Sequence, residues 1–161
     1  MATFFTLASS SAGNSSYIGA LGCGILVDCG ICCRSVTSGL AARDIEPEKL
    51  SGILVTHEHI DHVRGLKVLL KRYNLPLYTS APVLRYLTEY GLVPESAELH
   101  EIDEREFVLG GMLIEPFFTS HDSVGSRGYR VTTPDEHRIT VCTDTGFITT
   151  GAREHLLGSD A

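Results

Sequence analysis

Short runs of apolar and β-branched residues dominate the first part of the chain. Thr3 to Ala8 and Ser16 to Ala20 have the composition of short strands, and between them lies a stretch of small polar residues, Ser9 to Ser15. Two further apolar runs follow, Gly24 to Val27 and Gly52 to Val55. The pattern predicts four short strands in this region.

The middle of the chain changes to a helical period. A short helix is expected over Ser35 to Ala42, and Pro47 stands where the first turn of another would begin. A further helix is predicted after Arg64, because its apolar residues recur at i, i+3, i+4 and i+7, namely Leu66, Leu69, Leu70 and Tyr73. Leu77 and Tyr78 suggest a brief strand. Pro82 then opens a helix that ends at Gly91.

The remainder returns to a strand pattern. Strands are expected at Glu98 to Ile102, Phe107 to Leu109, Met112 to Phe118, Gly128 to Thr132 and Arg138 to Thr143. Glu154 to Leu157 is typical of a helix, and Ser159 to Ala161 of the entry to another strand. The order of elements predicts an α+β fold in a single domain, residues 1–161, with helices outside β-sheets in a sandwich of the αβ/βα type.

The most informative polar cluster follows the strand at Gly52 to Val55. His57, Glu58, His59, Asp61 and His62 place three histidines and two carboxylates within six residues. Charged histidines so close together would repel one another, whereas neutral imidazoles and ionised carboxylates are the groups that bind a divalent metal. The alternative is a polar loop in which histidines cluster by chance.

The spacing of this cluster suggests two metal positions. His57 and His59 point the same way if they continue a strand, because side chains alternate with a period of two. Asp61 and His62 follow the turn, at the start of a helix, and are expected to face a second point. Pairs of metal ions about 3.5–4 Å apart are a common hydrolytic arrangement. His121 and Asp144 each follow a predicted strand and could complete such a site.

The segment Thr56-His57-Glu58-His59-Ile60-Asp61-His62 resembles the signature of the metallo-β-lactamase-fold hydrolases. Four other segments are similar to the YycJ/WalJ branch of that family, whose members are described as DNA exonuclease-like hydrolases. They are Phe5 to Ser15, Leu26 to Gly30, Thr119 to Asp122 and Thr143 to Gly146.

The resemblance implies a ligand set for two divalent ions. His57, His59 and His121 would hold the first ion, Asp61 and His62 the second, and Asp144 would bridge them. Asp28 would brace the metal loop from behind without ligating, by accepting the other N–H of a histidine. Zinc suits these nitrogen and oxygen ligands, and manganese is the rival where carboxylates are plentiful.

The implied reaction is metal-dependent hydrolysis by an activated hydroxide, with DNA or another nucleic acid as substrate and Asp61 as the catalytic residue that orients the water or accepts its proton. Two alternatives stay open. One is a hydrolase of the same fold acting on small esters, thioesters or lactams. The other is an inactive fragment that binds a metal or a partner, because relatives carry a second half with a further histidine ligand, so the domain is expected to be incomplete at its C-terminus.

Composition restricts the setting. The 161 residues carry a net charge of −7, which argues against a protein that coats nucleic acid through charge alone. Basic residues do gather beside the histidine loop, either as a solvated helix face or near a substrate: Arg64, Lys67, Lys71 and Arg72. No apolar run is long enough for a membrane span, and no signal peptide is evident, so a cytoplasmic enzyme is expected. A homo-oligomer is compatible with the sequence.

Three features receive structural interpretations. The five cysteines are an odd number and fit a reducing compartment. Cys29, Cys32 and Cys33 are expected to be packing residues, despite the C-x-x-C spacing of the first two. Surface or capping roles are expected for the histidines outside the motifs, His100, His137 and His155. The stretch Ser9 to Ser15 is expected to build the fold, with hydroxyls and an amide beside the substrate as the alternative.

Overall fold

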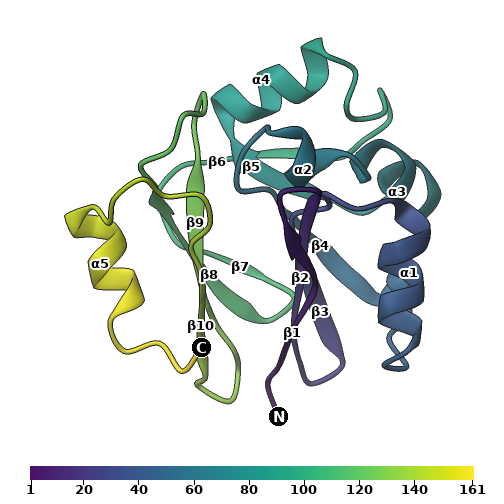
Figure 1. Cartoon of the computed structure of the whole chain (residues 1–161). Helices are drawn as coiled ribbons and strands as arrows, with labels where there is room; N and C mark the ends of the chain where they lie inside the picture. Colours follow the sequence, from purple (N-terminus) through teal and green to yellow (C-terminus); the bar gives the residue numbers. More distant parts are fainter.

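The computed structural model describes residues 1–161, and its two β-sheets face one another with helices on both outer sides (Figure 1). The first sheet has the strand order β1-β2-β3-β4-β5-β6. Its strands are β1 (Thr3–Ser10), β2 (Gly13–Ala20), β3 (Cys23–Val27), β4 (Leu50–Leu54), β5 (Leu77–Ser80) and β6 (Leu99–Ile102). The sheet begins as two antiparallel hairpins and continues parallel from β3 to β6.

Parallel pairing brings the carboxyl ends of β3, β4 and β5 to one end of the sandwich. The connection from β3 to β4 carries α1 (Cys33–Ala41) and the single turn η1 (Pro47–Lys49). The connection from β4 to β5 carries α2 (Ile60–Val63) and α3 (Leu66–Tyr73), and the one from β5 to β6 carries α4 (Ala81–Glu89). The histidine loop follows β4 directly, so the topology presents it at that end.

The helices cover the outer face of the first sheet and close a hydrophobic core there. Leu26 and Ile53 from the strands pack with Val36 of α1, Leu69 of α3 and Leu87 of α4, and all five are fully buried. The predicted apolar face of α3 is confirmed, because Leu66, Leu69 and Leu70 are buried and Tyr73 is half-buried. Burial of these side chains, each contributing about 1.5–3 kcal/mol, fixes the helices that follow the histidine loop.

The second sheet has the antiparallel order β10-β9-β8-β7. Its strands are β7 (Phe107–Leu109), β8 (Met112–Phe118), β9 (Arg127–Thr132) and β10 (Arg138–Val141), and α5 (Thr150–Leu156) covers its outer face. Ile114, Tyr129 and Val141 point inward and meet Ile25 and Leu54 of the first sheet in a second core. These layers confirm the predicted α+β sandwich of the αβ/βα type.

Several boundaries differ from the sequence prediction. The small-residue stretch Ser9 to Ser15 is mostly strand, because β1 and β2 pair up to Ser10 and Gly13 and leave only two residues in the turn. The helix expected at Pro47 is one 3₁₀ turn. The last helix begins at Thr150, where the Thr149 side chain caps it by accepting a hydrogen bond from Ala152 N at 3.1 Å.

The final residues lie beside β10. Asp160 N donates to Arg138 O at 2.7 Å, and Thr140 N donates to Ala161 O at 2.9 Å, in line with the strand entry expected there. Elsewhere, all five cysteines are free thiols, and no helix is long and apolar enough to cross a bilayer.

Candidate metal centre

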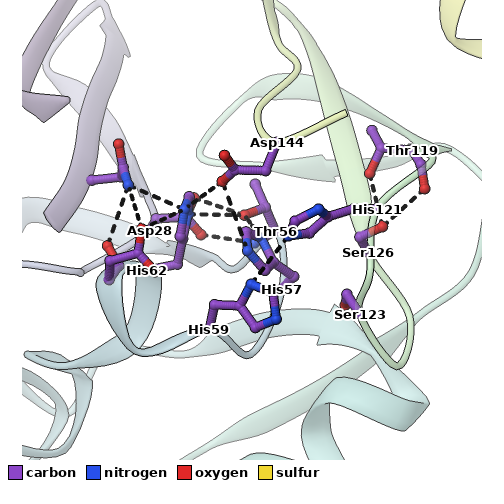
Figure 2. A network of polar contacts seen from close by, with 12 residues as sticks. Asp28, Thr56, His57, His59, His62, Thr119, His121, Ser123, Ser126 and Asp144 are labelled. Atoms are coloured by element: carbon purple, nitrogen blue, oxygen red, sulfur yellow. Dashed lines mark hydrogen bonds and ion pairs between the residues drawn. The ribbon is translucent and has the colours of Figure 1, made fainter. Parts of the chain in front are cut away.

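The predicted site residues converge at one end of the sandwich, where loops of both sheets meet (Figure 2). His57 and His59 lie on the loop after β4, with His59 at the N-cap of α2, and Asp61 and His62 lie within α2. His121 follows β8 and Asp144 follows β10. The first sheet therefore supplies four of these side chains and the second sheet supplies two.

The first cluster consists of His57, His59 and His121. One ring nitrogen of each lies within 4.8 Å of the others. His59 Nδ1 and His121 Nε2 are 3.1 Å apart, and the three rings meet nearly edge to face, with centroids 4.6–4.8 Å apart. Figure 2 shows the rings pointing toward a common point.

The second cluster consists of His57, His62 and Asp144, again with ligand atoms within 4.8 Å of one another. Asp144 Oδ2 lies 2.7 Å from His62 Nε2 and 3.8 Å from His57 Nε2. Asp61 is adjacent but outside this group, with Oδ2 3.6 Å from His62 Nε2. The structure thus places His57 between the two clusters, which the spacing of the sequence motif did not indicate.

Asp28 lies behind the histidine loop and is almost fully buried. Its Oδ2 is 2.8 Å from His62 Nδ1 and accepts a hydrogen bond from Thr56 Oγ1 at 2.8 Å, while Oδ1 accepts from Thr56 N at 2.8 Å. This geometry leaves His62 Nε2 directed at Asp144. It is the arrangement expected of a carboxylate that orients a histidine ligand.

A single peptide group fixes the start of the loop. Val55 O accepts hydrogen bonds from Thr79 Oγ1 at 2.7 Å and from Tyr129 Oη at 2.6 Å. The N–H of the same peptide, on Thr56, donates to Asp28. Strand β5, strand β9 and the residue after β3 therefore all hold the peptide between Val55 and Thr56, one residue before His57.

Burial and neighbouring charges shift the pKa values of His57 and His62 in opposite directions. Burial, together with the nearby His62, His121 and His59, lowers the pKa of His57 to about 3, so that its imidazole is neutral near pH 7. Burial also opposes the charged form of His62, but the hydrogen bond and charge of Asp28, with Asp144 and Asp61, outweigh it and raise the pKa of that ring.

These donors fit a divalent metal. His57 Nε2 is a buried polar atom without a hydrogen-bond partner, and it lies 3.8 Å from Asp144 Oδ2 of the second cluster. An unpaired buried nitrogen costs about 1–3 kcal/mol, and a metal ion would satisfy it. Imidazole nitrogens and carboxylate oxygens are ligands that zinc accepts. Ligation by each residue stays a prediction.

Two further residues shape the site. Asn14 Nδ2 lies 3.1 Å from His62 Nε2 and donates to Asp61 Oδ2 at 3.2 Å, so the small-residue stretch reaches the centre through its amide. The buried Glu58 points away from the clusters and accepts hydrogen bonds from Ser123 Oγ at 2.7 Å and Val124 N at 3.1 Å. Glu58 thereby ties the loop that carries His121 to the histidine loop.

The other candidate residues lie outside the centre. Cys29 and Cys33 are buried, as expected of packing residues, but the prediction is wrong for Cys32, which is exposed with Sγ 3.2 Å from Ser35 Oγ. No cysteine joins either cluster. The basic side chains that follow the histidine loop are all exposed, namely Arg64, Lys67, Lys71 and Arg72. His100 stacks on Tyr78 and His155 on Phe117, and His137 is exposed, in line with the structural roles predicted for these histidines.

Known proteins are similar to this chain in sequence and in fold. Residues 24–161 match the β-lactamase superfamily domain. Exodeoxyribonuclease WalJ of Streptococcus pneumoniae is 35% identical over 145 residues, which are 88% of this chain and 54% of the relative. Exodeoxyribonuclease YycJ of Bacillus anthracis is 30% identical over 159 residues, 98% of this chain and 60% of the relative. The chain thus spans little more than half the length of these curated relatives.

A solved structure agrees with this assignment. A motif mutant of the metallo-β-lactamase of Cronobacter sakazakii superposes with a TM-score of 0.75 at 17% identity, covering 86% of this chain and 60% of that one. At such low identity, the match supports the fold alone. The family implies a divalent metal centre, and the clusters above have the donors for one. The resemblance to the YycJ/WalJ branch is confirmed, and the chain belongs to the β-lactamase superfamily.

Proposed function

We propose that this chain is a metal-dependent phosphodiesterase that hydrolyses DNA from an end. The observation that carries the proposal is the pair of clusters that share His57, whose Nε2 is buried and unpaired. Two metal ions about 3.5–4 Å apart are an arrangement used in hydrolysis of phosphate esters.

The proposed ligands follow the geometry. His57, His59 and His121 would hold one ion, and His62 with Asp61 would hold the other. Asp144 lies close to both His62 and His57, as a bridging carboxylate requires. Zinc suits the four imidazoles, and manganese competes because two carboxylates take part.

When bound, such ions stabilise developing negative charge and lower the pKa of water to near neutrality. The chain supplies the positioning. Asp28 holds His62 through Nδ1, and Asn14 holds Asp61 through Oδ2, which leaves Asp61 Oδ1 to orient the attacking water or to accept its proton. The low pKa of His57 keeps its imidazole neutral, so that one of its two ring nitrogens is unprotonated and available as a ligand.

The substrate class rests on the relatives, two of which are named exodeoxyribonucleases. Because the chain spans 54–60% of their lengths, activity of these 161 residues by themselves is part of the proposal. We further propose a single domain acting in the cytoplasm, where five free thiols would stay reduced. Its oligomeric state is left open.

The test measures metal content and DNA cleavage together. The chain is loaded with zinc or manganese and incubated with 5′-labelled duplex and single-stranded DNA, and we expect stepwise shortening from an end. His59→Ala should lose bound metal and all cleavage. His137→Ala, at an exposed histidine outside the site, is the matched control and should retain both.

Two outcomes would contradict the proposal. Full metal content and cleavage in His59→Ala would show that the clusters are not the active site. Turnover of small esters, thioesters or lactams without DNA cleavage would instead favour another hydrolase of this fold.

A further inference from the structure

Three side chains form a row across the inner face of the second sheet, at the end where the histidines lie. Phe118 on β8 is paired in register with Arg127 on β9. Tyr129 is paired with Val141, the last residue of β10, and Thr143 follows two residues later, where an extension of that register would lie opposite Arg127. Tyr129 and Val141 face the core between the sheets, and residues two positions away on a strand share their face.

Each residue of this row is linked to a segment that carries residues of the candidate metal centre. Arg127 N donates to Thr56 O at 2.9 Å, one residue before His57. Thr143 immediately precedes Asp144, and Phe118 begins the segment that leads to His121. Thr143 also lines a cavity of about 210 Å³ between the first strands and β10, together with Asn14 and Asp28.

Two buried polar atoms of the row, Arg127 Nε and Thr143 Oγ1, lack partners. Only three buried side-chain nitrogen or oxygen atoms in the chain have no hydrogen bond: His57 Nε2, Arg127 Nε and Thr143 Oγ1. The first belongs to the metal clusters, and the other two belong to this row. Such atoms are uncommon in a folded protein, and their concentration at one site indicates a ligand that would satisfy them.

The charge of Arg127 is also unpaired. Its Nη1 donates to Ser126 O at 3.0 Å, its guanidinium lies 5.9 Å from the Phe118 ring centroid, and no carboxylate lies within ion-pair distance. By contrast, Arg130 pairs with Glu115 and Arg105 with Asp103. In a chain of net charge −7, a half-buried arginine without a carboxylate beside a proposed hydrolytic site is unusual.

We propose that Arg127, with Thr143, is an anion-binding subsite that holds a phosphate oxygen of the substrate next to the metal centre. The planar guanidinium donates in a geometry that matches phosphate, and the Thr143 hydroxyl adds a neutral donor. The Phe118 ring keeps the guanidinium in place through its electron-rich face. This subsite rests on the proposed phosphodiesterase function and extends it with a residue outside the metal ligands.

The test uses binding as its readout. Metal content, the Kd for inorganic phosphate and the Kd for a 5′-phosphorylated oligonucleotide are measured for the wild-type chain, Arg127→Gln, Arg127→Lys and Thr143→Val. Arg153→Gln, at an exposed arginine of α5, is the control. Phosphate binding is measured with and without metal.

We expect Arg127→Gln to weaken oligonucleotide binding by about tenfold or more, with unchanged metal content, and to reduce the salt dependence of binding by about one phosphate contact. Arg127→Lys should recover part of the affinity because it restores the charge. Thr143→Val should weaken binding less, and Arg153→Gln should leave it unchanged.

The subsite and the function can fail separately. If the wild-type chain does not cleave DNA but Arg127→Gln still weakens phosphate binding, the subsite stands and the phosphodiesterase proposal falls. If Arg127→Gln and Thr143→Val bind phosphate and oligonucleotide as tightly as the wild type, the subsite is wrong. Loss of metal together with affinity in Arg127→Lys would also overturn it, because the arginine would then be structural.

Discussion

Two carboxylates of the centre occupy left-handed backbone conformations. Asp28 has φ 63° at the end of β3, and Asp144 has φ 46° after β10. Aspartate enters this region more readily than most residues, and a remaining cost of about 1–3 kcal/mol is offset where neighbours hold the residue in place. At Asp28 the three hydrogen bonds to Thr56 and His62 do so, and the turn aims its carboxylate at the back of the histidine loop.

Asp28→Asn tests this role at the residue scale. An amide can replace only one carboxylate oxygen as an acceptor, so either Thr56 N, or both His62 Nδ1 and Thr56 Oγ1, would lose the acceptor. We expect the affinity for one of two zinc ions to fall about 10–100-fold, and the metal-free chain to lose about 1–3 kcal/mol of stability. Zinc titration followed by elemental analysis, and urea unfolding, provide the measurements.

Asp44→Asn is the matched control for that substitution. Asp44 has a similar left-handed backbone, φ 56°, but its side chain is exposed and makes no hydrogen bond. It should keep full zinc stoichiometry and stability. Equal zinc binding by Asp28→Asn and Asp44→Asn would mean that the buried carboxylate does not orient His62.

Among the elements, the turn after β3 and the short helix α2 depend on close backbone contact. Cys29 N donates to His62 O at 2.8 Å, and Gly30 N donates to Asn14 O at 2.8 Å. A Cβ on Gly30 would lie 1.6 Å from Asp61 O and 2.7 Å from Asn14 N. The absence of a side chain at Gly30 therefore lets β2, the end of β3 and α2 meet.

Gly30→Ala should separate these elements. Overpacking of a tight contact costs about 1–3 kcal/mol, and here it would also displace Asp61 and Asn14. We expect lower stability in chemical denaturation and weaker zinc binding. Gly151→Ala in α5, where an added Cβ meets nothing within 4 Å, should be neutral or slightly stabilising. If both alanine variants bind zinc and unfold alike, the close contact has no functional importance.

Strands β8 and β9 are joined on their outer face by an ion pair whose effect depends on pH. Arg130 Nε donates to Glu115 Oε2 at 2.8 Å, and both side chains are about one-fifth exposed. The hydrogen bond from Arg130, opposed by burial and supported by the arginine charge, lowers the pKa of Glu115 from its ordinary value. The folded state therefore binds this proton less readily than the unfolded state.

Glu115→Gln should remove a stabilisation that exists only above the acidic range. Because the folded-state pKa is lowered, the pair stabilises the fold above the unfolded pKa and loses that effect as the pH falls through the folded pKa. We expect a loss of about 1 kcal/mol at pH 7 that disappears in strong acid. Glu46→Gln, which breaks the exposed pair with Lys49, should change little at any pH. A pH-independent difference for Glu115→Gln would contradict the assignment.

At the scale of the whole molecule, the centre joins the two sheets. His57, His59, Asp61 and His62 belong to the first sheet and its connections, and His121 and Asp144 follow strands of the second. A ligand that binds only the folded chain stabilises it by about 2.7 kcal/mol at 100 times its Kd. Zinc should therefore raise the melting temperature by about 5–10 °C for a chain of this size.

Thermal unfolding with added zinc, and after treatment with a chelator, measures this effect. His121→Ala removes the ligand that the second sheet contributes to the first cluster, and it should lose much of the zinc-dependent increase. His137→Ala should keep it. An unchanged melting temperature in the presence of bound zinc would show that the metal does not connect the sheets.

Local patterns were sufficient to predict most of this architecture. The periods of apolar residues located the strands and helices, and the strand-ending His121 and Asp144 were expected near the histidine loop, as the structure places them. Three features depended on contacts between distant residues. The position of His57 in both clusters depends on how the loop turns after β4. The contact of Asn14 with the metal centre depends on the register of the β1–β2 hairpin. The hydrogen bond between Ser123 and Glu58 joins residues 65 positions apart.

The peptide between Val55 and Thr56 has a consequence for how the active end can move. The oxygen of this peptide accepts hydrogen bonds from β5 and β9, and its N–H donates to Asp28. The peptide plane cannot rotate without breaking these three hydrogen bonds. Any movement of the two sheets relative to each other is therefore expected to leave this peptide in place. The hydrogen bonds of Glu58 to Ser123 and Val124 join the loop of His121 to the same backbone, so we expect the metal site to be preorganised before an ion binds.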